Sequence, residues 1–257
     1  MPSSASSQRF DKIATNFATS EVHAMSPTIQ QLHKLLGEQI FDAVCDVACG
    51  TGHLALSFAN RARRIVGIDP SSNMLEAFQM LASQKGVVIE ATKALSENLP
   101  YPDNSFDVVM SRLAPHHFSD IERAVSEIVR VAKPGGVVAV IDLEGDPNAE
   151  IDDFNHALEV LHDPTHFRSY TAARWRTFFE RSGLAVESQE TKLSERPSGV
   201  SVKRWCEIAS SGAEAEAAIR DRLRSASPQY ITALGIRRDG DEFFMPIRTT
   251  LILGRKP

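Results

Sequence analysis

Short apolar runs alternate with segments of helical character through the first half of the chain. The runs lack the polar alternation of a half-exposed strand, and the predicted strands are Ala43–Val47, Arg64–Ile68, Val87–Ala91, Phe106–Ser111 and Val137–Ile141. Helical spacing or helix-start signals predict helices at residues 27–36, Gly52–Asn60, Ser72–Ser83 and Ile121–Val131. Strands that are apolar on both faces and alternate with helices predict a parallel sheet covered on both sides.

The pattern changes beyond residue 142. A polar, mostly helical stretch covers roughly residues 148–181, and residues 201–225 are helix-like and rich in Ala, Glu and Arg. Two late strands are predicted at Ala185–Thr191 and Met245–Leu253. The segment before the last strand therefore reads as an insertion.

This organisation predicts one main domain. We expect an N-terminal arm over residues 1–24 and a single domain over residues 25–257. The stretches near 148–181 and 201–225 are expected to form a helical cap that shapes a binding site.

Composition narrows the class of protein. Hydrophobic residues make up 42% of the 257 residues, and the formal net charge is -5 without a basic cluster, so nucleic acid is not an expected partner. The 3 cysteines have no zinc-like spacing, which is typical of a reducing cytosol. Met1–Ser7 lacks the apolar run of a secretory signal, and no stretch of about 18 apolar residues is present. We expect a cytoplasmic protein without a membrane partner, as a monomer or a homodimer.

A glycine-rich turn follows the first predicted strand. Within Val44–Ala55, the positions Gly50, Gly52 and Ala55 match the dinucleotide-binding fingerprint. Asp46 argues against a dinucleotide, because its carboxylate would repel a pyrophosphate bound at this turn. The same carboxylate attracts an ammonium group. S-adenosylmethionine carries an ammonium and a sulfonium and has no phosphate, so it fits this turn better.

A second acidic residue ends the next predicted strand. Asp69 lies 17 positions after Gly52 (69 − 52), where a carboxylate suits hydrogen bonding to both hydroxyls of a ribose. The alternative is that Asp46 and Asp69 only cap a turn or the following helix.

Further motifs extend the pattern along the chain. They are Gly67–Asp69, Leu99–Tyr101 with Ser105–Asp107, and Val129–Gly136. Together with the glycine turn, they resemble the successive motifs of class I S-adenosylmethionine-dependent methyltransferases. The segments Arg112–Phe118 and His162–His166 more narrowly resemble the YcgJ-like branch of the methyltransferase type 11 family. The resemblance implies a Rossmann-like fold with a seven-stranded, mostly parallel sheet, an antiparallel last strand and helices on both faces.

The resemblance also implies the residues that bind S-adenosylmethionine. Ser96 and Glu97 are expected beside the adenine, and Ser111 and Arg112 at the methionine end. The whole expected set is Asp46, Ala48, Cys49, Gly50, Gly52, Asp69, Pro70, Met74, Leu95, Ser96, Glu97, Ser111 and Arg112.

Two positions depart from the pattern of the family. Ala48 stands where relatives usually have Gly, and Leu95 stands where many have an Asp that contacts the adenine amine. Without that carboxylate, the backbone of Ser96 is the expected adenine contact. Phe10 and Phe17, in the N-terminal arm, are candidates to close over the cofactor.

Methyl transfer from a sulfonium requires alignment more than acid or base catalysis. A base is needed where the acceptor is an alcohol, a phenol or a neutral amine. The candidate catalytic bases are His116 and His117, which follow the fourth strand at the ligand-binding edge of the sheet. The alternative is that one histidine packs and the other hydrogen-bonds the backbone.

A second polar cluster is a candidate for lining the substrate pocket. It contains His162, His166 and Arg168. The i,i+4 spacing of the two histidines would suit a metal on a helix, but Pro164 interrupts that helix, so no metal is expected. The alternative is a hydrogen-bonded linker.

These observations bear on three functions. The leading hypothesis is methyl transfer from S-adenosylmethionine to a small-molecule substrate. A nicotinamide-dependent oxidoreductase would explain the glycines but not Asp46. A protein that binds the cofactor without transferring the methyl group would retain the same fold.

Overall fold

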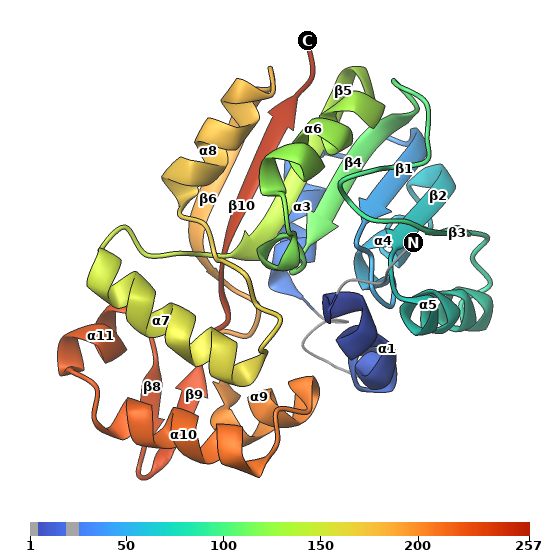
Figure 1. Cartoon of the computed structure of the whole chain (residues 1–257). Coiled ribbons are helices and arrows are strands. Elements are labelled where there is room, and N and C mark those ends of the chain that lie inside the picture. The colour runs from blue at the N-terminus through green and yellow to red at the C-terminus, as the bar shows by residue number, and fades with distance from the viewer. Residues whose placement is uncertain (1–4, 19–25) are drawn as a thin grey trace.

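The computed structural model describes residues 5–18 and 26–257, with the side chains of residues 15–18 excepted. A seven-stranded sheet runs through the larger part of the molecule in the order β3-β2-β1-β4-β5-β10-β6 (Figure 1). Its strands are β1 (Phe41–Val47), β2 (Ala62–Asp69), β3 (Glu90–Lys93), β4 (Phe106–Arg112), β5 (Ala132–Leu143), β6 (Ala185–Ser194) and β10 (Arg248–Arg255). β10 pairs antiparallel with both β5 and β6, so the other six strands are parallel. The predicted fold class is confirmed.

Helices cover both faces of the sheet. On one face lie α3 (Pro27–Leu35), α4 (His53–Leu56) and α5 (Ser72–Gln84), packed against β1, β2 and β4. On the other face lie α6 (Ile121–Val131) and α8 (Ala172–Arg181). The apolar stripe of α6 is buried as its spacing predicts, and the central strands β1, β4 and β5 are buried along most of their length.

Two boundaries differ from the predicted ones for local reasons. The helix predicted over Gly52–Asn60 ends at Leu56, where the Ser57 hydroxyl donates to the carbonyl of Leu54 at 2.6 Å. The strand predicted over Val87–Ala91 begins only at Glu90. The amide of Val87 instead donates to the carbonyl of Ala82 in α5, at 2.9 Å.

Lys133–Gly136, the end of the motif Val129–Gly136, form a bulge within β5. Phe106 of β4 pairs with Ala132, but Val108 already pairs with Val137, so the four residues between them loop out of the ladder. This loop pairs with the C-terminal end of the chain through hydrogen bonds between Gly135, Gly136 and Lys256.

A smaller part of the molecule, here called the cap, has its own core. It consists of α7 (Ala149–His162) and residues 196–247, which contain α9 (Val202–Ala209), α10 (Ala213–Arg224) and α11 (Pro228–Ala233). A three-stranded sheet joins β7 (Val200–Ser201), β9 (Glu242–Met245) and β8 (Arg237–Asp239). Figure 1 shows the cap beside the carboxyl ends of the main strands.

The cap differs in extent from the predicted segments. Of residues 148–181, only α7 belongs to it, because α8 packs on the main sheet through Trp175 and Phe179. The late strand predicted at Met245–Leu253 is two strands, since Met245 ends β9 in the cap and β10 begins at Arg248.

The helix α1 (Ala5–Ala18) connects the two parts. Asp11 accepts hydrogen bonds from the Ser71 hydroxyl and the Asn73 amide, at the start of α5. On the cap side, Arg9 forms an ion pair with Asp163 at 3.0 Å and donates to the carbonyl of Ala209 at 2.6 Å. The rest of the predicted arm, residues 1–4 and 19–24, lies outside the described residues, as does the side chain of Phe17.

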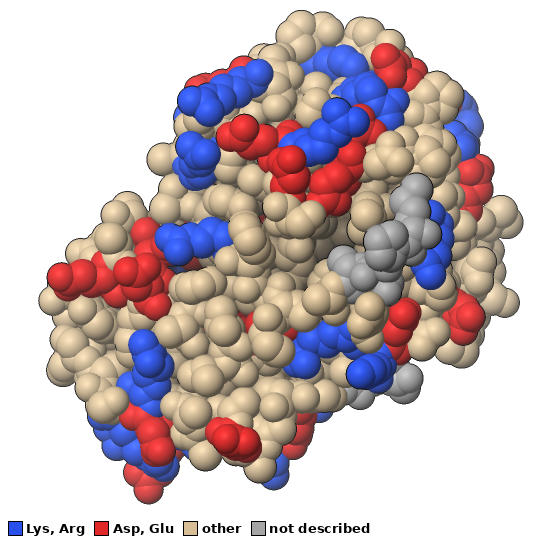
Figure 2. Space-filling model, in the orientation of Figure 1, with Lys and Arg blue, Asp and Glu red and all other residues tan. Residues whose placement is uncertain are grey.

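The surface carries charges of both signs. On the face shown in Figure 2, Lys and Arg side chains are interspersed with Asp and Glu. In the described part of the chain, no helix combines the length and apolar character that a membrane span requires.

Candidate functional site

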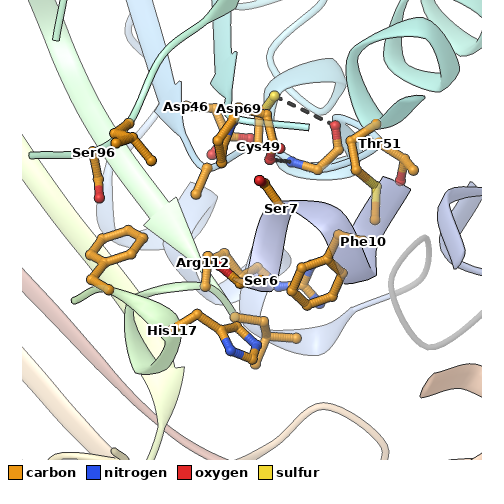
Figure 3. A pocket seen from close by; sticks show the side chains of 18 of the residues that line it. Ser6, Ser7, Phe10, Asp46, Cys49, Thr51, Asp69, Ser96, Arg112 and His117 are labelled. Atoms are coloured by element: carbon orange, nitrogen blue, oxygen red, sulfur yellow. Dashed lines mark hydrogen bonds between the residues drawn. The ribbon is translucent and has the colours of Figure 1, made fainter. Parts of the chain in front are cut away.

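A cavity of about 140 Å³ opens at the carboxyl ends of β1, β2 and β4. The strand order reverses between β1 and β4, and open α/β sheets bind ligands in the crevice at such a point. Figure 3 shows Asp46 and Asp69 on one side of this first cavity, and Phe10 and His117 on the opposite side. Most of the residues predicted to bind the cofactor line it, namely Asp46, Ala48, Cys49, Gly50, Asp69, Pro70, Met74, Leu95, Ser96, Glu97 and Arg112.

Asp46 is buried near the carboxyl end of β1 and faces the first cavity. Its carboxylate accepts a hydrogen bond from the amide of Ala55 at 3.0 Å. Burial raises the pKa of Asp46 to about 7, against the lowering effects of that amide and of Arg112. A cationic group in the cavity would stabilise the ionised carboxylate.

Asp69 ends β2 and organises the glycine turn. One carboxylate oxygen accepts from the amide of Gly50 and the other from the amide of Ser71, both at 2.8 Å. Burial raises the pKa of Asp69 to about 6, and the two amides oppose this effect. Each oxygen keeps a further lone pair for a donor in the cavity, such as a hydroxyl group.

The backbone of the glycine turn explains one departure from the family pattern. Ala48 has φ 55° and Gly50 has φ 53°, which is the left-handed region that glycine adopts without strain. The family's usual Gly would adopt this conformation without strain. Ala48 adopts it at the cost of a close contact between its Cβ and the backbone.

Gly52 does not line the cavity. A Cβ at this position would lie 1.9 Å from a ring carbon of Phe78 in α5, so the residue is glycine because α5 packs against the turn. Packing thus accounts for the glycine at this position, and the predicted ligand contact of Gly52 stays a prediction. Cys49 does line the cavity, and its sulfur also packs close to Gly67. Burial raises the pKa of the Cys49 thiol, so the group stays protonated.

Ser96 and Glu97 hold the loop that follows β3. The Glu97 carboxylate accepts from the hydroxyls of Ser96 and Ser119, both at 2.8 Å, and from the amides of Ser119 and Asp120. Leu95 places its side chain on the same wall of the first cavity. This loop therefore offers an apolar surface with backbone groups, rather than a free carboxylate.

Ser111 and Arg112 end β4 but differ in position. The buried Ser111 hydroxyl donates to the carbonyl of Val47 at 2.7 Å and does not line the cavity, so it ties β4 to β1. Arg112 does line the cavity and forms an almost fully buried ion pair with Glu195 at 2.9 Å. The hydroxyls of Ser26 and Thr28 also donate to Glu195.

A second cavity, of about 110 Å³, lies between the main sheet and the cap. Its walls are largely apolar, and the apolar lining is Leu143, Trp205, Ile208, Ala209, Leu234, Ile236, Met245, Pro246 and Ile247. Phe10, Leu113 and His117 line both cavities, so the two meet at these residues.

His116 lines the second cavity and is held by a buried carboxylate. Its Nδ1 lies 2.6 Å from Asp142, near the end of β5. Burial lowers the pKa of His116, but the charge and hydrogen bond of Asp142, with Glu159 and Asp163, outweigh it and raise the pKa overall. Nδ1 therefore carries the proton that Asp142 accepts.

His117 occupies the junction of the two cavities in a different environment. Its Nδ1 donates to the carbonyl of Thr165 at 2.9 Å, and its ring meets that of Phe10 edge to face at 5.1 Å. Burial and the neighbouring His116 lower the pKa of His117 to about 3, so this ring is neutral at physiological pH.

The predicted substrate cluster is only partly brought together. His162 and His166 line the second cavity, with His162 stacked on Trp205 at 3.9 Å and His166 stacked on His116 at 5.2 Å. Arg168 lines neither cavity and forms an ion pair with Asp152. Within residues 5–18 and 26–257, no group of three or more His, Cys, Asp or Glu residues is arranged to hold a metal ion.

Sequence reasoning missed several residues of both cavities. In the first they are Ser6, Ser7, Thr51, His53, Leu54, Leu113, Ala114, Phe118 and Ser119. In the second, Glu159 and the apolar wall of the cap went unrecognised, as did Asp142, which does not line the cavity but holds His116. Asp142 directly follows a predicted strand, and this position was the available signal.

Comparisons with known proteins identify the fold. Residues 45–140 match the family model described as a methyltransferase domain. The chain is 28% identical over 250 residues to the uncharacterized methyltransferase YcgJ of Bacillus subtilis, covering 96% of this chain and 97% of that one.

Solved structures agree with the sequence relatives. The crystal structure of YcgJ covers 89% of this chain and 97% of its own, with a TM-score of 0.79. A putative methyltransferase from Bacillus halodurans, 25% identical, covers 89% of this chain and 98% of its own, with a TM-score of 0.81. Residues 45–140 are thus a methyltransferase domain, and the chain resembles these methyltransferases in sequence and in fold, as its motifs predict.

Proposed function

We propose that the protein transfers a methyl group from S-adenosylmethionine, bound in the first cavity, to a small-molecule acceptor in the second. The observation that carries this proposal is the junction of the two cavities at Phe10, Leu113 and His117. A donor and an acceptor in adjoining cavities can meet only at this junction. Transfer of a methyl group between two bound molecules requires such a meeting point.

The residues of the first cavity fit the proposed cofactor. Asp46 would pair with its ammonium group, since a buried carboxylate with one amide donor has remaining lone pairs and gains from a cation. Asp69 would accept hydrogen bonds from the ribose hydroxyls. Leu95 and Met74 would pack against the adenine, with the backbone of Ser96 as its polar contact.

The bound cofactor supplies a methyl group on a positively charged sulfur, which is a good leaving group without acid catalysis. The protein has to align the acceptor with the methyl group and exclude water. Alignment of this kind is worth roughly 7–11 kcal/mol of a reaction barrier. α1 contributes by closing the junction with Phe10, and the cap contributes the acceptor pocket.

The nicotinamide-dependent alternative is not favoured by the site. A pyrophosphate at the glycine turn would face the buried carboxylate of Asp46, which has no cation within a direct ion pair among the described residues. The methyltransferase-domain match covers the same turn.

Calorimetric titration tests the proposed cofactor. The purified protein is titrated with S-adenosylhomocysteine and, in parallel, with NADH, and both titrations are repeated on Asp46→Asn and Asp69→Asn. The proposal predicts binding of S-adenosylhomocysteine alone, weakened by each substitution. Binding of NADH alone would overturn it, and so would binding of neither ligand.

A further inference from the structure

The second cavity contains one histidine whose side chain and backbone are both fixed. The Nδ1 of His116 is 2.6 Å from Asp142, whose side chain is fully buried. The carbonyl of His116 accepts from the amides of Phe167 and Arg168, at 2.9 and 3.1 Å. Since Nδ1 is engaged by Asp142, Nε2 is the nitrogen that remains for a molecule in the cavity.

His117 is less suited to removing a proton, although it lies at the junction. Its Nδ1 donates to a neutral carbonyl, whereas that of His116 donates to a carboxylate. Only the carboxylate stabilises the imidazolium that forms when a ring accepts a proton. Burial and the proximity of His116 also make His117 a weak base.

The charges around the second cavity indicate what kind of acceptor it admits. The carboxyl groups of Glu144, Glu159 and Asp163 line it together with one arginine, Arg248. That arginine is engaged by Glu144 and Asp146, at 3.8 and 3.3 Å. Asp163 is likewise engaged by Arg9 at 3.0 Å. Both arginines are thus already paired with carboxylates, which disfavours a carboxylate or phosphate on the acceptor.

We propose that His116 is the general base for an uncharged, largely apolar acceptor with a hydroxyl group, such as a phenol, and that Asp142 is its positioning residue. This inference rests on the proposed function. The acceptor's O–H proton passes to Nε2 of His116 as the oxygen forms a bond to the methyl carbon. The methyl–sulfur bond breaks, its electron pair stays on sulfur, and the proton later leaves His116 to solvent.

The pH dependence follows from the groups that face His116. These are Asp142 from β5, Glu159 and Asp163 from α7 and its end, His117 from the same turn, and His166 from the next loop. Asp142 and the other carboxylates raise the pKa of His116. The base must be neutral to act, so the rate rises with pH as His116 loses its proton. Asp142→Asn moves this rise to lower pH and lowers the plateau.

Two probe acceptors of the same shape distinguish the loss of the general base from general damage to the site. These are 2-naphthol, which needs help to lose its proton near neutral pH, and 2-naphthalenethiol, which ionises more readily. Methylation of both is measured with wild type, His116→Asn, Asp142→Asn and His117→Asn. His33→Asn, on α3 and outside both cavities, is the matched control.

We expect His116→Asn to lower kcat/KM for the naphthol about 100-fold or more and to change that for the thiol less than about fivefold. S-adenosylhomocysteine should bind His116→Asn, Asp142→Asn and His33→Asn as tightly as wild type, because these residues do not line the first cavity. Naphthol methylation that survives in His116→Asn overturns the inference, as does an equal loss with both probes. So does a wild type that binds S-adenosylhomocysteine and leaves the naphthol unmethylated. Failure of the wild type to bind it would instead defeat the proposed function.

An NMR titration of the histidine rings gives a readout that does not depend on turnover. In the complex with S-adenosylhomocysteine, His116 should have the highest pKa among the cavity histidines, and Asp142→Asn should lower it. A His116 pKa that does not respond to Asp142→Asn would remove Asp142 from its positioning role and contradict the proposal.

Discussion

The two cavities are built in different ways. The first is lined by turns that directly follow three parallel strands, with one carboxylate at each of two neighbouring strand ends, Asp46 and Asp69. The second is assembled from α1, the turn after β4, the end of β5 and the cap, which are far apart in the sequence. Local strand–turn–helix geometry thus determines the first cavity, whereas packing between distant segments determines the second.

The largest expected effect comes from breaking the buried ion pair at the edge of the first cavity. Glu195 is the residue before the cap segment 196–247. It forms an ion pair with Arg112, which lines the first cavity, and accepts hydrogen bonds from the hydroxyls of Ser26 and Thr28. Glu195→Ala leaves the Arg112 guanidinium buried without its partner, and we expect a loss of about 3–5 kcal/mol in the free energy of unfolding. Denaturant unfolding measures it. Glu187→Ala, which removes an exposed ion pair with Arg255, is the control and should cost less than about 1 kcal/mol.

A glycine pair tests whether the turn is shaped by packing or by ligand contact. Gly52→Ala places a methyl group against the Phe78 ring in a left-handed backbone, and we expect a loss of about 2–4 kcal/mol in unfolding free energy. Gly50→Ala meets only the Met74 sulfur, at 3.9 Å, so it should cost about 1 kcal/mol and mainly weaken S-adenosylhomocysteine binding. Equal thermal stability of the two variants would contradict this division.

Asp46 should show opposite effects on stability and on binding. Its pKa in the folded protein, about 7, lies above that of the unfolded chain, so its contribution to stability is present below pH 4 and is lost as pH rises through 7. Asp46→Asn should therefore raise the unfolding free energy at pH 8 by on the order of 1–3 kcal/mol. It should weaken S-adenosylhomocysteine binding about 10–100-fold. A variant that is less stable than wild type at pH 8 would count against the pKa assigned to Asp46.

The same carboxylate makes cofactor binding depend on pH. A ligand ammonium favours the ionised form of Asp46, so the affinity of wild type should rise between pH 5.5 and 7.5 and then level off. Asp46→Asn should reduce this rise, leaving the part due to Asp69, whose pKa is about 6. Calorimetry across this range checks it, and an identical pH profile in the variant would rule the carboxylate out.

The smallest expected effect concerns α1. Asp11 ties this helix to Ser71 and Asn73 at the start of α5, so Asp11→Ala should loosen the closure by Phe10 and lower S-adenosylhomocysteine affinity a few-fold. Lys12→Ala, at an exposed position on the same helix, serves as the control. Unchanged affinity in Asp11→Ala, with the helix otherwise intact, would show that the helix does not contribute to binding.

Sequence patterns predict the first cavity well because its determinants are local. A strand, a small-residue turn and a helix start can be read over a dozen residues, and Asp46, Gly50 and Asp69 lie where this pattern places them. Gly52 shows the limit of the same reasoning. Its requirement for glycine comes from Phe78, which is distant in the sequence, and spacing alone cannot distinguish that cause from contact with a ligand.

The second cavity was predicted less completely for the same physical reason. His116 and His117 could be placed at a strand end, but their different roles depend on Asp142 and Thr165, which approach them only in the folded chain. The small sheet of the cap escaped prediction because its strands are only two to four residues long. Such runs carry too little periodicity to separate them from loops.

The most direct test of the account is a crystal structure of the protein with S-adenosylhomocysteine bound. We predict the ligand in the first cavity, with its amino group near Asp46, its ribose hydroxyls on Asp69 and its sulfur directed at the junction of Phe10, Leu113 and His117. A ligand bound in the second cavity, or one whose sulfur faces away from the junction, would contradict the assignment of the cofactor to the first cavity and of the acceptor to the second.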